Sequence, residues 1–339
     1  MLGSPPETAQ PPSPMRNPPP ALAPTRRTLF ASALGAGGWI GLSLAGRAAA
    51  QTAPAAASPA PAGGREPLFE ISLAQWSLHK LLYGGELDAL DFPRFTRETF
   101  GLGEVEYVNS FFKDHGADFR YLADLRQRCA DHGIRSGLIM IDGEGNLGAA
   151  DPRERRKACE RHFRWISAAA FLGCRAIRVN AAGTGTPEEH SQQAAESLHA
   201  LAEVAQDFGQ FVLVENHGGR SSDGSWLAET IRRADHPRVG TLPDFGNFQI
   251  EAGVWYDRYL GVEQLMPFAQ AVSAKSHDFD AEGNETGTDF RRMLRIVLDA
   301  GYRGPIGIEY EGSRLPEVEG VRATQRLLER LREELAAAR

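Results

Sequence analysis

The chain has 339 residues, of which 42% are hydrophobic and 24% are charged, and its formal net charge at pH 7 is −7. This composition is that of a globular protein with a sizeable core, and the acidic balance argues against a nucleic-acid partner. The cysteines, Cys129, Cys159 and Cys174, lack metal-ligand spacing. We expect buried thiols, and one disulfide pair stays open if the protein works in an oxidising compartment.

Residues 1–50 have the pattern of an export signal. Arg26 and Arg27 precede a Gly-, Ala- and Leu-rich stretch that runs to about Gly46, followed by a small-residue cleavage site at Ala48–Ala50. This pattern predicts a signal peptide for the bacterial twin-arginine translocase, hence a periplasmic or secreted protein. An uncleaved anchor is the alternative, although residues 29–46 are only marginally long enough to span a membrane. Residues 51–65 form an Ala/Pro linker, and the chain without residues 1–50 has a formal charge of −10.

Residues 66–339 alternate short β-branched runs with longer amphipathic ones, which is the pattern of repeated βα units. Helices are expected at 119–132, 152–172 and 187–208, each followed by a glycine, as helix C-termini commonly are. Eight such units predict a single-domain (β/α)8 TIM barrel, whose active residues lie at the C-terminal ends of the strands. The strands are expected to start near Ile71, Val105, Gly137, Ala176, Phe211, Val239, Ala271 and Pro305.

The last four of these apolar runs end in a carboxylate or an imidazole, at Glu215, Asp244, His277 and Glu309. Side chains at i and i+2 of a strand share a face, and only one face of a barrel strand looks into the lumen. The polar phase is therefore expected to point inward, and the apolar phase to pack under the helices. The inward set is Leu213, Glu215, His217, Ser273, Lys275, His277, Gly307, Glu309 and Glu311, and the outward set is Val212, Val214, Ile306 and Ile308.

Three carboxylates and one imidazole from four consecutive strands form a set of ligands that suits Mn²⁺ or Mg²⁺, with Co²⁺ or Zn²⁺ as alternatives. Such a metal ion can hold neighbouring oxygens of a sugar and stabilise the enediolate that forms when a carbon-bound proton is removed. Glu215 and Glu309 are the candidate acid/base pair for that proton. Glu311 is an alternative to Glu309 at the metal.

In these motifs the chain resembles the xylose isomerase-like TIM barrels, which include sugar phosphate isomerases and epimerases, ketose epimerases, hydroxypyruvate isomerase and inosose dehydratase. The resemblance covers about residues 68–335. It implies that the metal set of the family falls on Glu215, Asp244, His277 and Glu309, in the same order and on the same strands. It also implies that Glu215 and Glu309 exchange the proton, as the two metal-bound glutamates do in ketose epimerases.

The chain departs from the family pattern at three positions. Many relatives carry His-apolar-Lys-Asp on the seventh strand, whereas the order here is Lys275-Ser276-His277-Asp278. One alignment puts Lys275 in the ligand position, and the other keeps His277 as a ligand with Lys275 on substrate oxygens or as a proton donor. Asn247 and Gly283 stand where ketose epimerases tend to have a histidine and an arginine.

Further side chains near the expected strand ends are candidates for sugar binding through stacking or hydrogen bonds. Alternatively, Glu106 and Arg178 form a buried ion pair with each other. The alternative role for His217 is to order its glycine-rich loop. The substrate-binding candidates are Trp76, His79, Glu106, Asn109, Arg178, Asn180, His217, Asn247 and Lys275.

The residues favour a metal-dependent isomerase or epimerase acting on an unphosphorylated sugar, ketose or cyclitol, by proton transfer next to a carbonyl. A lyase or dehydratase acting on a keto-sugar or inosose uses the same enediolate and is the first alternative. A carbohydrate-binding barrel without catalysis is the second. Association into homo-oligomers is left open, since no motif identifies an interface.

Overall fold

The computed structural model describes residues 67–338, so the predicted signal peptide and linker at residues 1–65 lie outside the described residues. Eight parallel strands form one sheet in the order β6-β5-β4-β3-β2-β1-β10-β9. Each strand begins within two residues of its expected start, which confirms the eight predicted strands. They are β1 (Ile71–Ala74), β2 (Glu104–Val108), β3 (Arg135–Met140), β4 (Ala176–Val179), β5 (Phe211–Glu215), β6 (Val239–Leu242), β9 (Val272–Ser276) and β10 (Ile306–Tyr310).

The two edge strands of this sheet, β6 and β9, meet through bridges that each join a residue of one strand to a residue flanking the other. Parallel bridges join Thr241 to Ala269 and Asp244 to Ser273. The backbone N–H of Ser273 donates to the carbonyl of Pro243 at 2.9 Å, and that of Phe245 donates to the carbonyl of Ser273 at 3.1 Å. These bonds close the barrel, and they place Asp244 on the seam.

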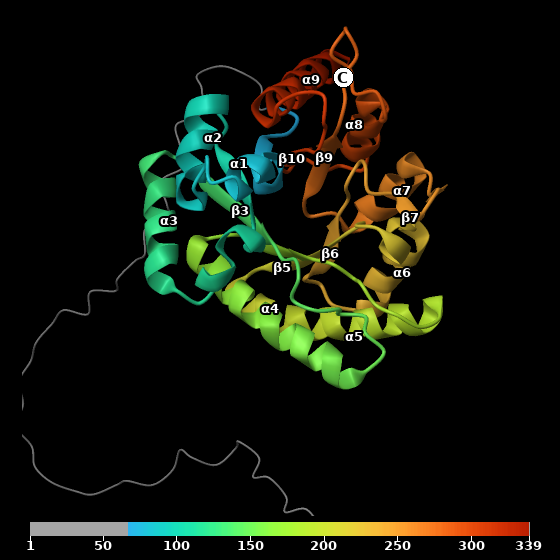
Figure 1. The fold of residues 1–339 in the computed structure, drawn as a ribbon. Coiled ribbons are helices and arrows are strands. Elements are labelled where there is room, and N and C mark those ends of the chain that lie inside the picture. Colours follow the sequence, from blue (N-terminus) through green and yellow to red (C-terminus); the bar gives the residue numbers. More distant parts are fainter. Residues whose placement is uncertain (1–66, 339) are drawn as a thin grey trace, which may run out of the picture. The chain divides into compact units, whose positions relative to one another are not determined.

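Helices follow the strands and lie around the outside of the sheet (Figure 1). Among residues 67–338, no helix combines the length and the apolar character that crossing a membrane requires. The α-helices are α1 (His79–Tyr83), α2 (Phe92–Phe100), α3 (Phe119–Asp131), α4 (Pro152–Leu172), α5 (Pro187–Ala205), α6 (Gly224–Ala234), α7 (Arg258–Leu265), α8 (Phe290–Asp299) and α9 (Glu317–Ala337). A short hairpin of β7 (Gln249–Glu251) and β8 (Val254–Trp255) follows β6, and 3-10 turns occur at Gln75–Leu78, Ala89–Asp91, Asn109–His115, Gln206–Phe208, Gly219–Ser222 and Met266–Phe268.

The helix ends follow local sequence signals. α4 begins after Asp151, whose side chain accepts a hydrogen bond from the N–H of Arg153, and it ends at Gly173 with a φ of 84°. α5 begins with a capping box between Thr186 and Glu189. The predicted range of α4 is confirmed, whereas α5 stops at Ala205 and continues as a 3-10 turn to Phe208.

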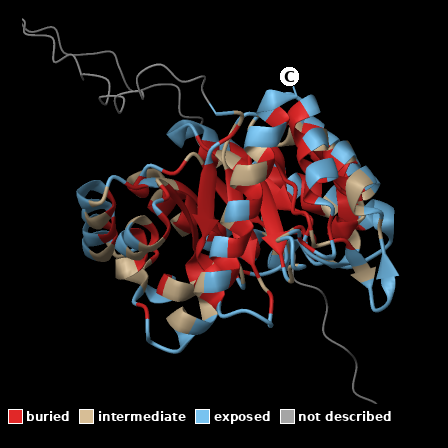
Figure 2. Cartoon of the chain, turned by 90° about the horizontal axis from the view of Figure 1, so that it is seen from above, coloured by how far each residue is buried: buried red, intermediate tan, exposed pale blue. Residues whose placement is uncertain are grey.

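Two apolar layers enclose the strands, and Figure 2 shows buried residues in the strands and on the helix faces turned toward them. Val212, Val214, Ile306 and Ile308 belong to the layer between strands and helices, as the alternation predicts. The three cysteines are buried and free, which confirms the expected thiols. The opposite phase forms a separate apolar cluster: Ala74, Val108, Leu138, Met140, Ala176, Leu213, Leu242 and Ala271.

Candidate active site

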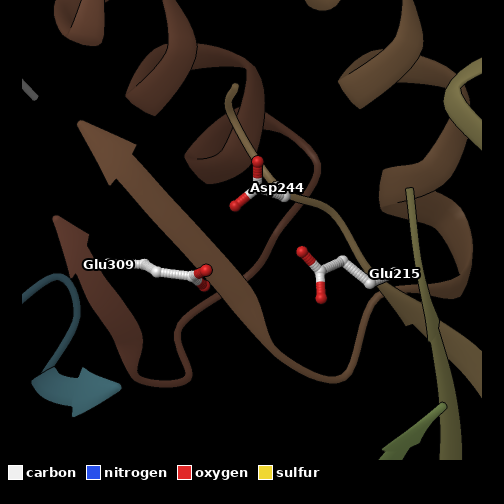
Figure 3. A group of neighbouring side chains, drawn as sticks. All are labelled: Glu215, Asp244 and Glu309. Atoms are coloured by element: carbon white, nitrogen blue, oxygen red, sulfur yellow. The ribbon is translucent and has the colours of Figure 1, made fainter. Parts of the chain in front are cut away.

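Three carboxylates converge at the C-terminal end of the barrel. Glu215 is the last residue of β5, Asp244 lies two residues beyond β6, and Glu309 lies near the end of β10. One oxygen of each lies within 4.8 Å of the others, and all three side chains are buried. Figure 3 shows their carboxylate groups pointing toward one another from separate elements. Glu215 and Glu309 reach this site because their side chains lie on the strand faces that were expected to point into the barrel.

Asp244 is oriented by the turn that follows β6. The N–H groups of Gly246 and Asn247 both donate to its Oδ1 at 2.8 Å, and its own N–H donates to Oδ1 of Asn216 at 2.8 Å. Its Oδ2 has no hydrogen bond. A buried oxygen without a partner is costly, so this atom indicates a place for a ligand. Burial raises the pKa of Asp244 to about 7.

Glu215 is contacted from two sides. The side-chain amide of Asn247 donates to Oε1 at 2.9 Å, and Nε of Arg178 lies 2.9 Å from Oε2. Burial raises the pKa of Glu215 to about 7, even though the positive charges of Arg178 and Lys275 oppose the shift. A carboxyl with a pKa near neutrality is suited to accept and return a proton.

Lys275 lies inside this group of acids with 3% of its surface exposed. Its backbone is in register with Glu309 on the neighbouring strand, and both residues are buried. Its Nζ lies 3.1 Å from Oε1 of Glu309 and 3.1 Å from Oε2 of Glu311. Burial alone lowers the pKa of a lysine, but the surrounding carboxylates outweigh it and hold the pKa of Lys275 well above its ordinary value. Lys275 is therefore an ammonium ion.

His277 does not join the three carboxylates. Its side chain is exposed, and its backbone N–H donates to Oε1 of Glu285 at 3.3 Å. The reason is that β9 ends at Ser276, so the alternation that would turn residue 277 inward stops one residue earlier. Lys275 is the last inward residue within the strand and takes the place expected for the histidine. Glu215, Asp244 and Glu309 form a group that could hold a metal ion without His277.

A cavity of about 480 Å³ lies next to the site. Trp76 forms part of its wall, and the ring of Trp76 packs against those of Tyr83 and Phe111. The indole N–H of Trp76 donates to Glu311. Aromatic faces beside polar groups are a common way to bind sugars. The cavity is lined by Trp76, Tyr83, Val108, Ser110, Asp142, Arg178, His217, Glu309 and Glu311.

Sequence reasoning missed Tyr83, Ser110 and Asp142 as lining residues. They lie in the segments that follow β1, β2 and β3. Asp142 directly follows the apolar run of β3 and Ile141, which is the only signal that would have indicated it. Asn109 holds the Asp142 segment, because its side-chain amide donates to the carbonyl of Asp142 at 3.0 Å and its Oδ1 accepts from the N–H of Asp142 at 2.9 Å.

Arg178 and Glu106 do not form the pair considered from the sequence. Arg178 instead contacts Glu215 and places Nη1 2.8 Å from Oδ1 of Asp142. Glu106 accepts a hydrogen bond from Ser72 at 2.6 Å. The register explains the difference, since Glu106 is level with Leu138 and hence with Ala176, two residues before Arg178, and β3 lies between.

The remaining candidates divide between the cavity and its surroundings. His217 lines the cavity, and desolvation together with Arg178 and Lys275 lowers its pKa, which favours a neutral ring. Its backbone N–H also donates to Ser221 at 3.0 Å, so the residue takes part in ordering its loop. Asn180 donates to Oδ1 of Asp142 at 2.7 Å. His79 stacks on Trp76 from outside the cavity lining and contacts the carbonyl of Trp76 at 2.8 Å.

Glu106 provides a prediction about pH. Burial raises its pKa to about 7 from an ordinary 4.5. Between these values the folded protein keeps a proton that the unfolded chain has released, so this residue's contribution to stability falls as the pH rises through that window. The unfolding free energy of the wild type minus that of Glu106→Gln should therefore drop by roughly 3 kcal/mol between about pH 4 and pH 8.

Urea denaturation at several pH values measures this difference. The control is Glu98→Gln, which replaces an exposed carboxylate on α2 and should give a difference nearly independent of pH. A difference for Glu106→Gln that is equally flat would show that Glu106 titrates normally in the folded protein.

The barrel and the buried acids at the carboxyl ends of its strands define a TIM barrel with an enzyme-type site. Residues 98–333 match the model of the xylose isomerase-like TIM barrel family, and the chain belongs to this family. A search of curated proteins by sequence found no significant match.

Similar solved structures include sugar epimerases and isomerase-domain proteins. An L-ribulose 3-epimerase has a TM-score of 0.62 at 16% identity, covering 80% of this chain and 96% of the other. A xylose isomerase domain protein from Planctomyces limnophilus has a TM-score of 0.61 at 16% identity, with 80% and 100% covered. A xylose isomerase-like TIM barrel protein from Mycobacterium smegmatis, in complex with magnesium, has a TM-score of 0.59 at 18% identity, with 78% and 97% covered. At these identities the likeness establishes the fold.

Proposed function

We propose that this protein is a sugar isomerase or epimerase that moves a proton at a carbon next to a carbonyl. The observation that carries the proposal is the convergence of Glu215, Asp244 and Glu309, all buried, beside a cavity at the carboxyl ends of the strands. The family and the fold, which an L-ribulose 3-epimerase shares, support the same class of reaction.

A divalent metal ion fits the three carboxylates. All the donors are oxygens, and Oδ2 of Asp244 lacks a hydrogen bond. Such hard donors suit Mn²⁺ or Mg²⁺ better than softer ions. When bound, the ion would supply Lewis-acid stabilisation of negative charge on the substrate's oxygens. We propose Glu215, Asp244 and Glu309 as its ligands.

In the proposed reaction, Glu215 and Glu309 have different roles in proton transfer. We propose that Glu215 accepts the proton from carbon, since its pKa of about 7 allows it to be charged or neutral near pH 7. Asn247 and Arg178 hold its carboxylate in place through one contact on each oxygen. Glu309, which lies on β10 at another side of the site, gives the carbon a proton that it has taken from solvent, and Glu215 releases its proton to solvent. Trp76 positions the sugar by stacking against its ring.

The substrate that we propose is an unphosphorylated sugar. Asp142, Glu309 and Glu311 line the cavity, and the cations Arg178 and Lys275 are already paired with acids, so a phosphate dianion would meet net repulsion. Export through the twin-arginine route, which we propose from Arg26 and Arg27, also favours such a sugar, since sugar phosphates are mainly cytoplasmic. N-terminal sequencing of the periplasmic protein tests that route.

Hydrogen exchange with solvent tests the reaction. The purified protein with Mn²⁺ or Mg²⁺ is incubated in D₂O with a panel of ketoses, aldoses and keto-sugars. We expect deuterium at the carbon next to the carbonyl, together with a new isomer, and loss of exchange after treatment with EDTA. A dehydrated, ultraviolet-absorbing product would make the protein a lyase. Sugar binding without any exchange would make it a binding protein.

A further inference from the structure

The positively charged ammonium group of Lys275 lies within the proposed metal site. Its ammonium lies 3.1 Å from Glu309, which is one of the three converging carboxylates, and 3.1 Å from Glu311, which is not. The negative charges of Asp244 and Glu215 also act on it. With 3% of its surface exposed, the ammonium has these acids in place of water.

The absence of a side chain at Gly246 leaves room for the side chain of Lys275. Gly246, in the turn that holds Asp244, passes so close that a Cβ there would lie 3.0 Å from both Cγ and Cδ of Lys275. Such a distance is tighter than ordinary van der Waals contact, so a larger residue at 246 would push the lysine stem or the turn aside. The turn that orients Asp244 therefore packs directly against the aliphatic part of the Lys275 side chain.

Glu311 gives the ammonium a partner outside the carboxylate group. Its carboxylate accepts from Lys275 and from the indole N–H of Trp76, so it is held in the cavity wall. An ammonium shared between Glu309 and Glu311 can stay paired with Glu311 when Glu309 binds another cation. The ammonium of Lys275 can thus compete with a metal ion for Glu309, and it can remain paired with Glu311 when the metal ion binds.

We propose that Lys275 is a resident cation that keeps the three carboxylates assembled without a metal ion and makes divalent metal binding weak and reversible. An ammonium has no lone pair to offer a metal and repels it through space, whereas a histidine at this position would be a ligand. The inference rests on the proposed metal site, and metal binding tests it independently of any reaction.

The test compares Mn²⁺ affinities of the purified protein and its variants by equilibrium titration. Lys275→Met removes the charge at similar length and should bind Mn²⁺ about 10-fold more tightly, and Lys275→His, which also adds a ligand, about 100-fold more tightly. Glu311→Gln should weaken binding about 10-fold, because the ammonium loses its second partner and stays on Glu309. Lys157→Met, an exposed lysine on α4, is the control and should match the wild type.

Opposite changes for Lys275→Met and Glu311→Gln would support the proposal. It is overturned if Lys275→Met folds, as judged by a cooperative thermal transition, and binds Mn²⁺ no more tightly than the wild type. If the Lys275 variants do not fold, Glu311→Gln decides, and unchanged or tighter binding in that variant overturns the proposal. Metal binding by Lys275→Met but not by the wild type would support the role of Lys275 while removing the metal from the proposed function. Absence of sugar exchange in a metal-loaded protein would instead contradict the reaction alone.

Discussion

Replacing Glu215 by glutamine should lower the rate of solvent-hydrogen exchange at the sugar carbon by about 10³-fold or more. The amide keeps the shape of the side chain, and its oxygen can still accept a hydrogen bond from Asn247 or Arg178, but it cannot accept a proton from carbon. It also removes one negative charge from the proposed metal ligands, so Mn²⁺ binding should weaken in the same variant. Mass spectrometry of deuterium uptake and metal titration measure the two effects separately.

Glu106→Gln is the matched control for this experiment. Glu106 is also a buried glutamate of the barrel lumen, but it contacts Ser72 in a lower layer and does not line the cavity. Its replacement should change the exchange rate by no more than a few-fold. Exchange that survives in Glu215→Gln at the wild-type rate would move the acid/base role to another residue.

Replacing Arg178 by leucine should lower the free energy of unfolding by about 3–5 kcal/mol, because it leaves charged partners in a buried site without their cation. Arg178 is buried between Glu215 and Asp142 and contacts both. The loss should be greater at pH 8 than at pH 5. With its pKa raised to about 7 by burial, Glu215 is protonated at the lower pH and then needs no counter-charge.

Urea denaturation at the two pH values measures this effect. Arg94→Leu is the control, since Arg94 is exposed and pairs with exposed Glu98 on α2, so its loss should cost less than about 1 kcal/mol. Equal, small losses for both arginines would mean that Arg178 contributes little to holding the site together.

The course of the strands could be predicted because strand formation and side-chain alternation are local. A period of two decides which residues share a face, so Glu215, Lys275 and Glu309 could be assigned to the lumen and Val212 and Val214 to the outer layer. Helix ends were equally local, since Asp151 and Gly173 mark those of α4 through their own backbone and side-chain preferences.

The partners within the site could not be predicted in the same way. The sequence pattern offered Glu106 as a buried partner of Arg178, or a sugar-binding role for both, and it left His277 or Lys275 beside the acids. Each choice depends on where neighbouring strands stop and how they are staggered, which no single segment contains. β9 ends at Ser276, so the histidine turns away and the lysine remains inside.

The sequence by itself therefore determined the barrel, its inward and outward faces and the acids at the ends of its strands, because these follow from short-range preferences and a period of two. Only the tertiary structure decided that Lys275 pairs with Glu309 and Glu311, that Arg178 pairs with Glu215, and that Asp244 lies on the seam between β6 and β9. Long-range pairing is set by register and barrel closure, and charges buried together must find partners within the reach of a side chain.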